Sequence, residues 1–163
     1  GLNFSRPAAQ ILGQYYQFIR LGFEGYKNIQ YNSLSIAKYL HDTVAQMPEF
    51  QPYSEEVPNP IFTWLMKPEF QKTAKWTLFD LQDKLAQKGW MVPAYTLPAN
   101  IQNVVVMRVL CKQGFSRDMA DQLLNDIRFA ITELNALEYP TTTRIAMEKN
   151  IPLVPKSFNH TGK

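Results

Sequence analysis

The segment from residue 11 to residue 23 constrains the fold most, because its apolar side chains cover most of the circumference of a helix. Its apolar residues are Ile11, Leu12, Tyr15, Tyr16, Phe18, Ile19, Leu21 and Phe23. A helix that is apolar all round is normally buried on all sides. The chain has 163 residues, the length of a single domain. We therefore expect this helix to need a partner surface from outside the chain.

The first 47 residues are predicted to be helical, with a break in the middle. Ser5 can cap a helix and Pro7 fits its first turn, where the missing N–H has no cost. Gly22 and Gly25 predict a kink or break. After the break the apolar residues lie on one side of the helix, which we expect to end at Pro48.

The remaining pattern alternates short strands with helices. We expect strands at residues 61–66, 90–97 and 104–111, with a helix between Thr77 and Gly89. Thr77 and Asp80 resemble a capping box, and Pro93 favours an edge position for its strand.

Ser116 opens the last predicted helix. The chain from Tyr139 onward reads as irregular because prolines interrupt it. The predicted buried face of this helix consists of Met119, Leu123, Ile127, Ala130, Ile131 and Leu134.

Strands joined by a short turn are antiparallel, and three helices can cover one face of such a sheet. The sequence therefore predicts an α+β fold: a two-layer domain with a small antiparallel sheet covered by helices, preceded by a long N-terminal helix.

Charge and composition exclude several classes of protein. The net charge is +3 with basic residues scattered singly, which argues against nucleic acid as a partner. A run of 18 apolar residues is absent, so we expect no membrane span, and no signal peptide is evident. The single cysteine, Cys111, fits a reducing cytoplasm. His41 and His160 lack metal-ligand spacing, so no metal is expected.

Arg108 is the most informative polar residue. Both faces of its strand, residues 104–111, are apolar, so we expect the guanidinium to be shielded from water. A shielded guanidinium needs an anionic partner. One interpretation is an internal ion pair with Asp80 or Asp83. The other is a bidentate clamp on a carboxylated or phosphorylated ligand.

Two residues near the termini also have alternative interpretations. Ser5 is either a plain helix cap or, beside Arg6, part of a phosphate site at a helix N-terminus. His160 is either a solvated terminal residue or a pH-sensitive group, because the charge of a histidine can change between about pH 5 and 8. The sequence shows no nucleophile–base–acid arrangement and no phosphate-binding loop, so we expect no catalytic residue in this chain.

Several short motifs resemble glutamate decarboxylases of the pyridoxal 5'-phosphate (PLP) family. They are LNFSRP at 2–7, AAQ at 8–10, QYY at 14–16, FIRLGFEGY at 18–26, TLFDL at 77–81, GW at 89–90, VPA at 92–94, VVVMRVLC at 104–111, GF at 114–115 and SFNHT at 157–161. The segment 48–75 and the last two residues depart from the family pattern. The resemblance runs through the whole chain and implies a C-terminal fragment of a bacterial-type enzyme.

The resemblance implies that the full enzyme converts L-glutamate to 4-aminobutyrate and CO₂ in the cytoplasm, as part of acid resistance. It implies PLP in the full-length enzyme and none in the fragment, because no residue here matches the Schiff-base lysine. The chain would be inactive alone. The alternatives are another PLP-dependent amino-acid decarboxylase, or a free-standing, non-enzymatic binding module with this fold.

The resemblance also implies roles for three residues. Arg108 matches the arginine that grips the substrate α-carboxylate. Ser5 matches a serine that reaches the PLP phosphate of the neighbouring subunit, which requires at least a dimer. His160 belongs to a tail that closes over the active site near neutral pH.

The same resemblance implies a division of the chain into three parts. Residues 1–33 would be a helix from the end of the large PLP domain. Residues 34–150 would form the small domain of a fold-type I PLP enzyme, and residues 151–163 would form a flexible tail. The large domain of the same chain is then the expected partner of the first helix.

Overall fold

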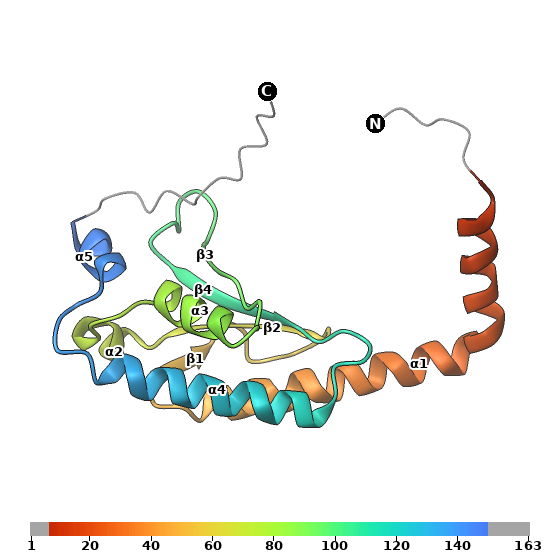
Figure 1. Ribbon diagram of the computed structural model, residues 1–163, viewed down its shortest axis with the longest axis horizontal. Coiled ribbons are helices and arrows are strands. Elements are labelled where there is room, and N and C mark those ends of the chain that lie inside the picture. Colours follow the sequence, from red (N-terminus) through yellow and green to blue (C-terminus); the bar gives the residue numbers. More distant parts are fainter. Residues whose placement is uncertain (1–6, 150–163) are drawn as a thin grey trace.

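A mixed arrangement of strands and helices occupies residues 7–149, the part of the chain that this computed structural model describes. Within it, one four-stranded antiparallel sheet has the strand order β1-β2-β4-β3 (Figure 1). Its strands are β1 (Phe50–Pro52), β2 (Ile61–Met66), β3 (Ala94–Thr96) and β4 (Val105–Leu110). β3 lies at an edge, as Pro93 predicts.

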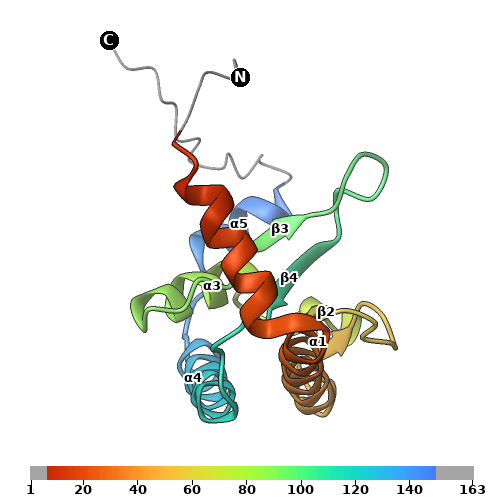
Figure 2. The same cartoon turned by 90° about the vertical axis from the view of Figure 1, so that its right-hand side faces the viewer.

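Three helices cover one face of this sheet: α1 (Ala9–Ala45), α3 (Leu78–Gln87) and α4 (Arg117–Asn135). The second half of α1 and the whole of α4 lie side by side along this face, and α3 packs against α4 (Figure 2). The core between the layers includes Leu40, Trp64, Leu81, Met107 and Ile127, all at most 1% exposed. The predicted two-layer α+β architecture is confirmed.

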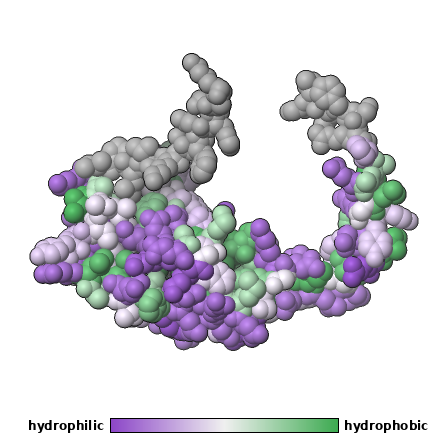
Figure 3. Space-filling view, in the orientation of Figure 1, coloured by the Kyte–Doolittle hydropathy of each residue, from purple (hydrophilic) through white to green (hydrophobic). Residues whose placement is uncertain are grey.

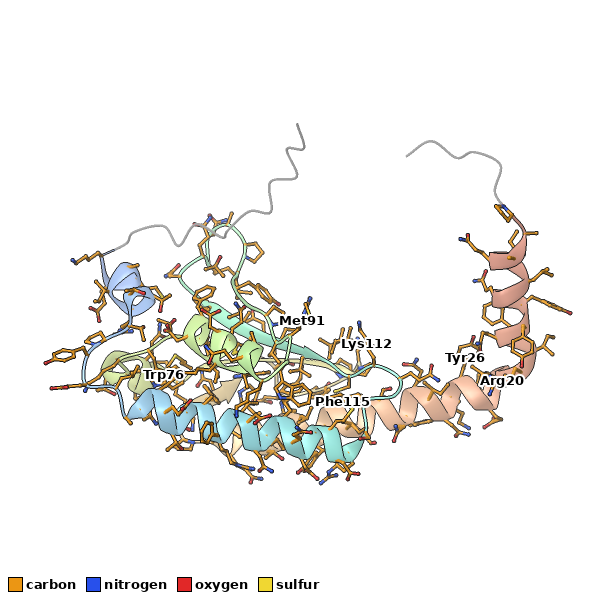
Figure 4. The ribbon with its side chains drawn as sticks, viewed as in Figure 1. Arg20, Tyr26, Trp76, Met91, Lys112 and Phe115 are labelled. Carbon is orange, nitrogen blue, oxygen red and sulfur yellow. The ribbon has the colours of Figure 1, made fainter. Side chains whose placement is uncertain are left out.

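The first part of α1 projects away from this core. Gly22 has φ 57° and ψ −171°, which breaks the helix as predicted, and the ribbon turns sharply there (Figure 1). Arg20 and Tyr26 flank the bend, far from the buried Trp76 (Figure 4). Burial along α1 begins at Ser33. The assignment of residues 1–33 and 34–150 to different domains stays a prediction.

The arm before the bend, residues 9–21, carries its apolar side chains in the open. Apolar and polar residues alternate over its surface (Figure 3). Ile11 is 70% exposed and Ile19 is 68% exposed, and Phe23 just beyond the bend is 79% exposed. The rest of residues 7–149 therefore does not cover the apolar side chains of this arm.

Local sequence signals predict the starts of α3 and α4, whereas the predicted start of α1 was wrong: its N-cap is Ala8, so Pro7 lies before the helix rather than in its first turn. The Thr77–Asp80 capping box forms, with the Thr77 backbone N–H donating to Asp80 Oδ2 at 2.7 Å. Ser116 Oγ accepts from the Met119 backbone N–H at 3.2 Å at the start of α4. Gly89 follows α3 with φ 89°, a conformation that favours glycine.

Four further expectations were wrong or incomplete. The segment after Tyr139 contains a helix, α5 (Thr142–Glu148), because the Thr141 side chain caps it. The short elements β1 and α2 (Pro68–Thr73) lie in the proline-rich region that gave weak signals. The predicted strand 90–97 is shortened to β3. Met119, in the first turn of α4, is 40% exposed rather than buried.

No helix within the described residues is long and apolar enough to cross a membrane.

Candidate functional site

β4 has one face in the core and one face pointing away from the helix layer. Met107 and Val109 pack in the core. Arg108 and Leu110 lie on the opposite face and are exposed, Leu110 by 47%. The prediction that Arg108 is shielded from water was therefore wrong. Apolar residues occur on both faces of the strand, but the three long helices cover only one of them, which leaves the guanidinium accessible.

Two side chains on neighbouring strands flank Arg108. Thr63 of β2 lies directly opposite it in the antiparallel register. On the other side, the Tyr95 ring of β3 lies 5.7 Å from the Arg108 guanidinium carbon, measured to the ring centroid. The Arg108 backbone N–H donates to the Pro93 carbonyl at 3.2 Å, which holds β3 beside this position.

Arg108 makes no ion pair within residues 7–149. Asp80 instead accepts hydrogen bonds from Thr77, Thr141 and Thr143, and Asp83 is exposed on α3. The interpretation of an internal ion pair with Asp80 or Asp83 is therefore wrong for the described part of the chain. An accessible guanidinium with its planar set of N–H donors can bind a carboxylate in bidentate fashion.

Two hollows lie near the ends of the sheet. One of about 310 Å³ borders Thr63, the residue opposite Arg108, and is also lined by Tyr53 and Glu56. The other, of about 180 Å³, is lined by Arg144, whose Nε lies 2.9 Å from Glu148. A covalent PLP site requires a lysine in a pocket. No lysine lines either hollow, so neither one fits PLP.

The described residues also lack an evident reactive centre. Burial raises the pKa of the Cys111 thiol to about 11, which disfavours the reactive thiolate. Among residues 7–149, no group of three His, Cys, Asp or Glu side chains could hold a metal ion. Of the three residues singled out from the sequence, Arg108 is the one within residues 7–149, and its exposed guanidinium could bind an anion.

Comparison with known proteins shows which proteins the chain is similar to. No protein-family model matches the chain. A glutamate decarboxylase beta of Listeria innocua is 41% identical over 134 residues, which is 82% of this chain. A glutamate decarboxylase of Solanum lycopersicum is 40% identical over 134 residues. The solved glutamate decarboxylase of Lactobacillus brevis superposes with a TM-score of 0.77 at 35% identity over 84% of this chain. The chain is a homologue of the glutamate decarboxylases.

The match covers only part of each glutamate decarboxylase. The chain spans 28% of the length of the Listeria innocua protein, 26% of the Solanum lycopersicum protein and 31% of the Lactobacillus brevis chain. A sphingosine-1-phosphate lyase of Burkholderia pseudomallei, with a TM-score of 0.65 at 18% identity, shares the fold alone. The chain therefore aligns with one segment of these longer glutamate decarboxylases.

The three residues singled out from the sequence are not brought together in the described part of the chain. Only Arg108 lies within it, since Ser5 and His160 fall outside the described residues. Sequence reasoning missed Tyr95 as a neighbour of Arg108. The turn at residues 98–100 indicates that the two strands are neighbours but leaves their register open, so the sequence carried no signal for this pairing.

Proposed function

We propose that this chain is the C-terminal part, mainly the small domain, of a PLP-dependent glutamate decarboxylase. The full enzyme would convert L-glutamate to 4-aminobutyrate and CO₂ in the cytoplasm and contribute to acid resistance. The observation that carries the proposal is the accessible Arg108 on the face of the sheet opposite the helix layer. Support comes from the 35% identity to a solved glutamate decarboxylase of the same fold.

Arg108 would bind the α-carboxylate of the substrate. Two parallel N–H···O bonds fix the plane of the carboxylate as well as its position. This orientation determines which bond of the substrate is held ready to break. PLP, when bound by the rest of the enzyme, supplies the electron sink for that bond cleavage. Arg108 itself neither donates nor accepts a proton in the reaction, because a guanidinium stays protonated in proteins.

The exposed arm of α1 would pack against the large domain of the same enzyme. Tyr15 is 64% and Tyr16 59% exposed, so a further apolar surface is needed to cover them. The full enzyme would be a homo-oligomer, at least a dimer, with Ser5 contacting the PLP phosphate of the neighbouring subunit.

The tail around His160 would respond to pH in the full enzyme. The ordinary pKa of histidine, about 6.5, lies in the range in which such a tail would have to switch. Deleting residues 157–163 should extend activity toward neutral pH, measured as a pH–activity profile at saturating PLP. Superimposable profiles would assign the pH switch to another part of the enzyme.

A substrate comparison tests the proposed activity. The full-length protein that contains this chain, loaded with PLP, should release CO₂ from L-glutamate faster than from L-aspartate or an aromatic amino acid. A preference for another amino acid would instead support the alternative decarboxylase. The 163-residue chain alone should release no CO₂. Turnover by the isolated chain would contradict the proposal that the catalytic lysine lies elsewhere.

A further inference from the structure

Tyr95 is the aromatic side chain beside Arg108 on the face of the sheet opposite the three helices. It pairs with Val106 in the register between β3 and β4, so its side chain lies on the same face as Arg108, two residues along. The ring centroid is 5.7 Å from the guanidinium carbon, within the range of a cation–π contact. Tyr95 is half-buried, whereas Arg108 is exposed.

The strand that carries Tyr95 is fixed to the rest of the domain. The Ala94 backbone N–H donates to Gln82 Oε1 of α3 at 2.7 Å, and Ala94 is 9% exposed. On the other side of Tyr95, the Leu97 backbone N–H donates to the Val104 carbonyl at 3.0 Å. These contacts hold the backbone on both sides of the ring, so the ring has a defined place next to the guanidinium.

We propose that Tyr95 is a positioning residue that restricts Arg108 to the orientation in which it binds the substrate carboxylate; this inference rests on the proposed function. An arginine side chain has many rotamers, and an exposed one samples them in water. A ring on one side of the guanidinium favours those rotamers that keep the contact. The N–H groups at the edge of the guanidinium then stay free for a carboxylate.

The substrate's Michaelis constant should report this role in the PLP-loaded, full-length enzyme. Tyr95→Val removes the ring and keeps a side chain that favours strands. It should raise KM for L-glutamate roughly 3- to 10-fold and leave kcat within about twofold. The reason is that the Tyr95–Arg108 contact would stabilise the bound substrate and the transition state equally. Tyr95→Leu should behave the same way. Tyr95→Phe keeps the ring and should stay within about twofold of the unaltered enzyme.

A merely structural role for Tyr95 would give a different pattern. It would lower the active fraction, and with it the apparent kcat, without raising KM. Phe129→Leu is the matched control, because the Phe129 ring contacts Lys88 Nζ at 4.9 Å in a cation–π pair between α4 and the residue that caps α3. This control should leave both kinetic constants unchanged.

A double-mutant cycle separates this inference from the proposed function. In an Arg108→Gln background, Tyr95→Val should cause no further rise in KM. Suppose that Arg108→Gln lowers kcat/KM, so that the proposed function stands. The positioning role is then overturned if Tyr95→Val leaves KM unchanged, or if Tyr95→Phe is as impaired as Tyr95→Val. If Arg108→Gln leaves kcat/KM unchanged, the proposed function itself has failed.

Discussion

Asp80 and Thr141 connect the start of α3 to the segment that leads into α5, with the Thr141 hydroxyl donating to Asp80 Oδ2 at 2.9 Å. The same carboxylate oxygen accepts from the Thr77 hydroxyl at 2.8 Å and, in the α3 capping box, from the Thr77 backbone N–H at 2.7 Å. One side chain therefore stabilises a helix terminus and holds the end of the described chain against the core.

Replacing Asp80 with alanine should lower the free energy of unfolding by about 2–4 kcal/mol. The change removes a helix cap and leaves shielded hydroxyl groups without their acceptor. Urea unfolding of the 163-residue chain measures the effect. Asp83→Ala, at an exposed position of the same helix, is the control and should change stability by at most about 0.5 kcal/mol. Equal effects of the two substitutions would contradict the role of Asp80.

These contacts show how far the sequence alone predicts the fold. The capping box at Thr77 joins residues three positions apart, so the pattern is readable from the sequence. The bond to Thr141 joins residues 61 positions apart and depends on how the chain returns to α3. The start of α5 combines both kinds of contact, because Thr141 accepts locally from the Arg144 backbone N–H and is held against α3 by its bond to Asp80.

Gly22 determines the direction of the arm of α1. Its φ of 57° and ψ of −171° are available to glycine and strained for alanine. Because a Cβ at this position meets nothing within 4 Å, Gly22→Ala should straighten the helix rather than unfold the body. The radius of gyration from small-angle scattering should rise. Gly13→Ala, at a regular helical position, should leave it unchanged. A bent Gly22→Ala chain would show that contacts rather than the glycine hold the bend.

The loss of an apolar side chain should change the free energy of unfolding much less in the exposed arm than in the core. Ile19→Gln should change the unfolding free energy of the isolated chain by at most about 0.5 kcal/mol, because Ile19 is 68% exposed. Leu40→Ala should lower it by about 2–5 kcal/mol, because Leu40 is 0% exposed. Chemical denaturation of both variants measures the difference. A large loss in Ile19→Gln would mean that the arm packs against the body.

Cys111 should make stability fall in alkaline solution. Its folded pKa of about 11 lies above its ordinary value of 9.0, so the folded state keeps the proton that the unfolded state releases. The stabilisation is complete below pH 9 and is lost as the pH rises through 11. Cys111→Ala should remove this part of the pH dependence in denaturation curves. A wild-type slope in Cys111→Ala would assign the alkaline loss to other groups.

The candidate site was only partly predictable. Alternation along residues 104–111 places Arg108 on one face of a strand, and this much follows from the sequence. Which face the helices cover depends on the packing of α1, α3 and α4, so the expected shielding of Arg108 was wrong. The neighbour Tyr95 depends on strand register, which an eight-residue connection does not specify by pattern alone.

The kinetic constant kcat/KM of Arg108→Lys for L-glutamate, measured in the PLP-loaded full-length enzyme, tests the proposed role of this chain most directly. Lysine keeps the charge but cannot form the planar, two-bond contact with a carboxylate. We expect kcat/KM to fall about 10- to 150-fold, the equivalent of roughly 1.5–3 kcal/mol. Arg128→Lys, at an exposed position of α4, is the control and should keep kcat/KM unchanged. An Arg108→Lys enzyme with wild-type kcat/KM and only a lower melting temperature would contradict the carboxylate-binding role.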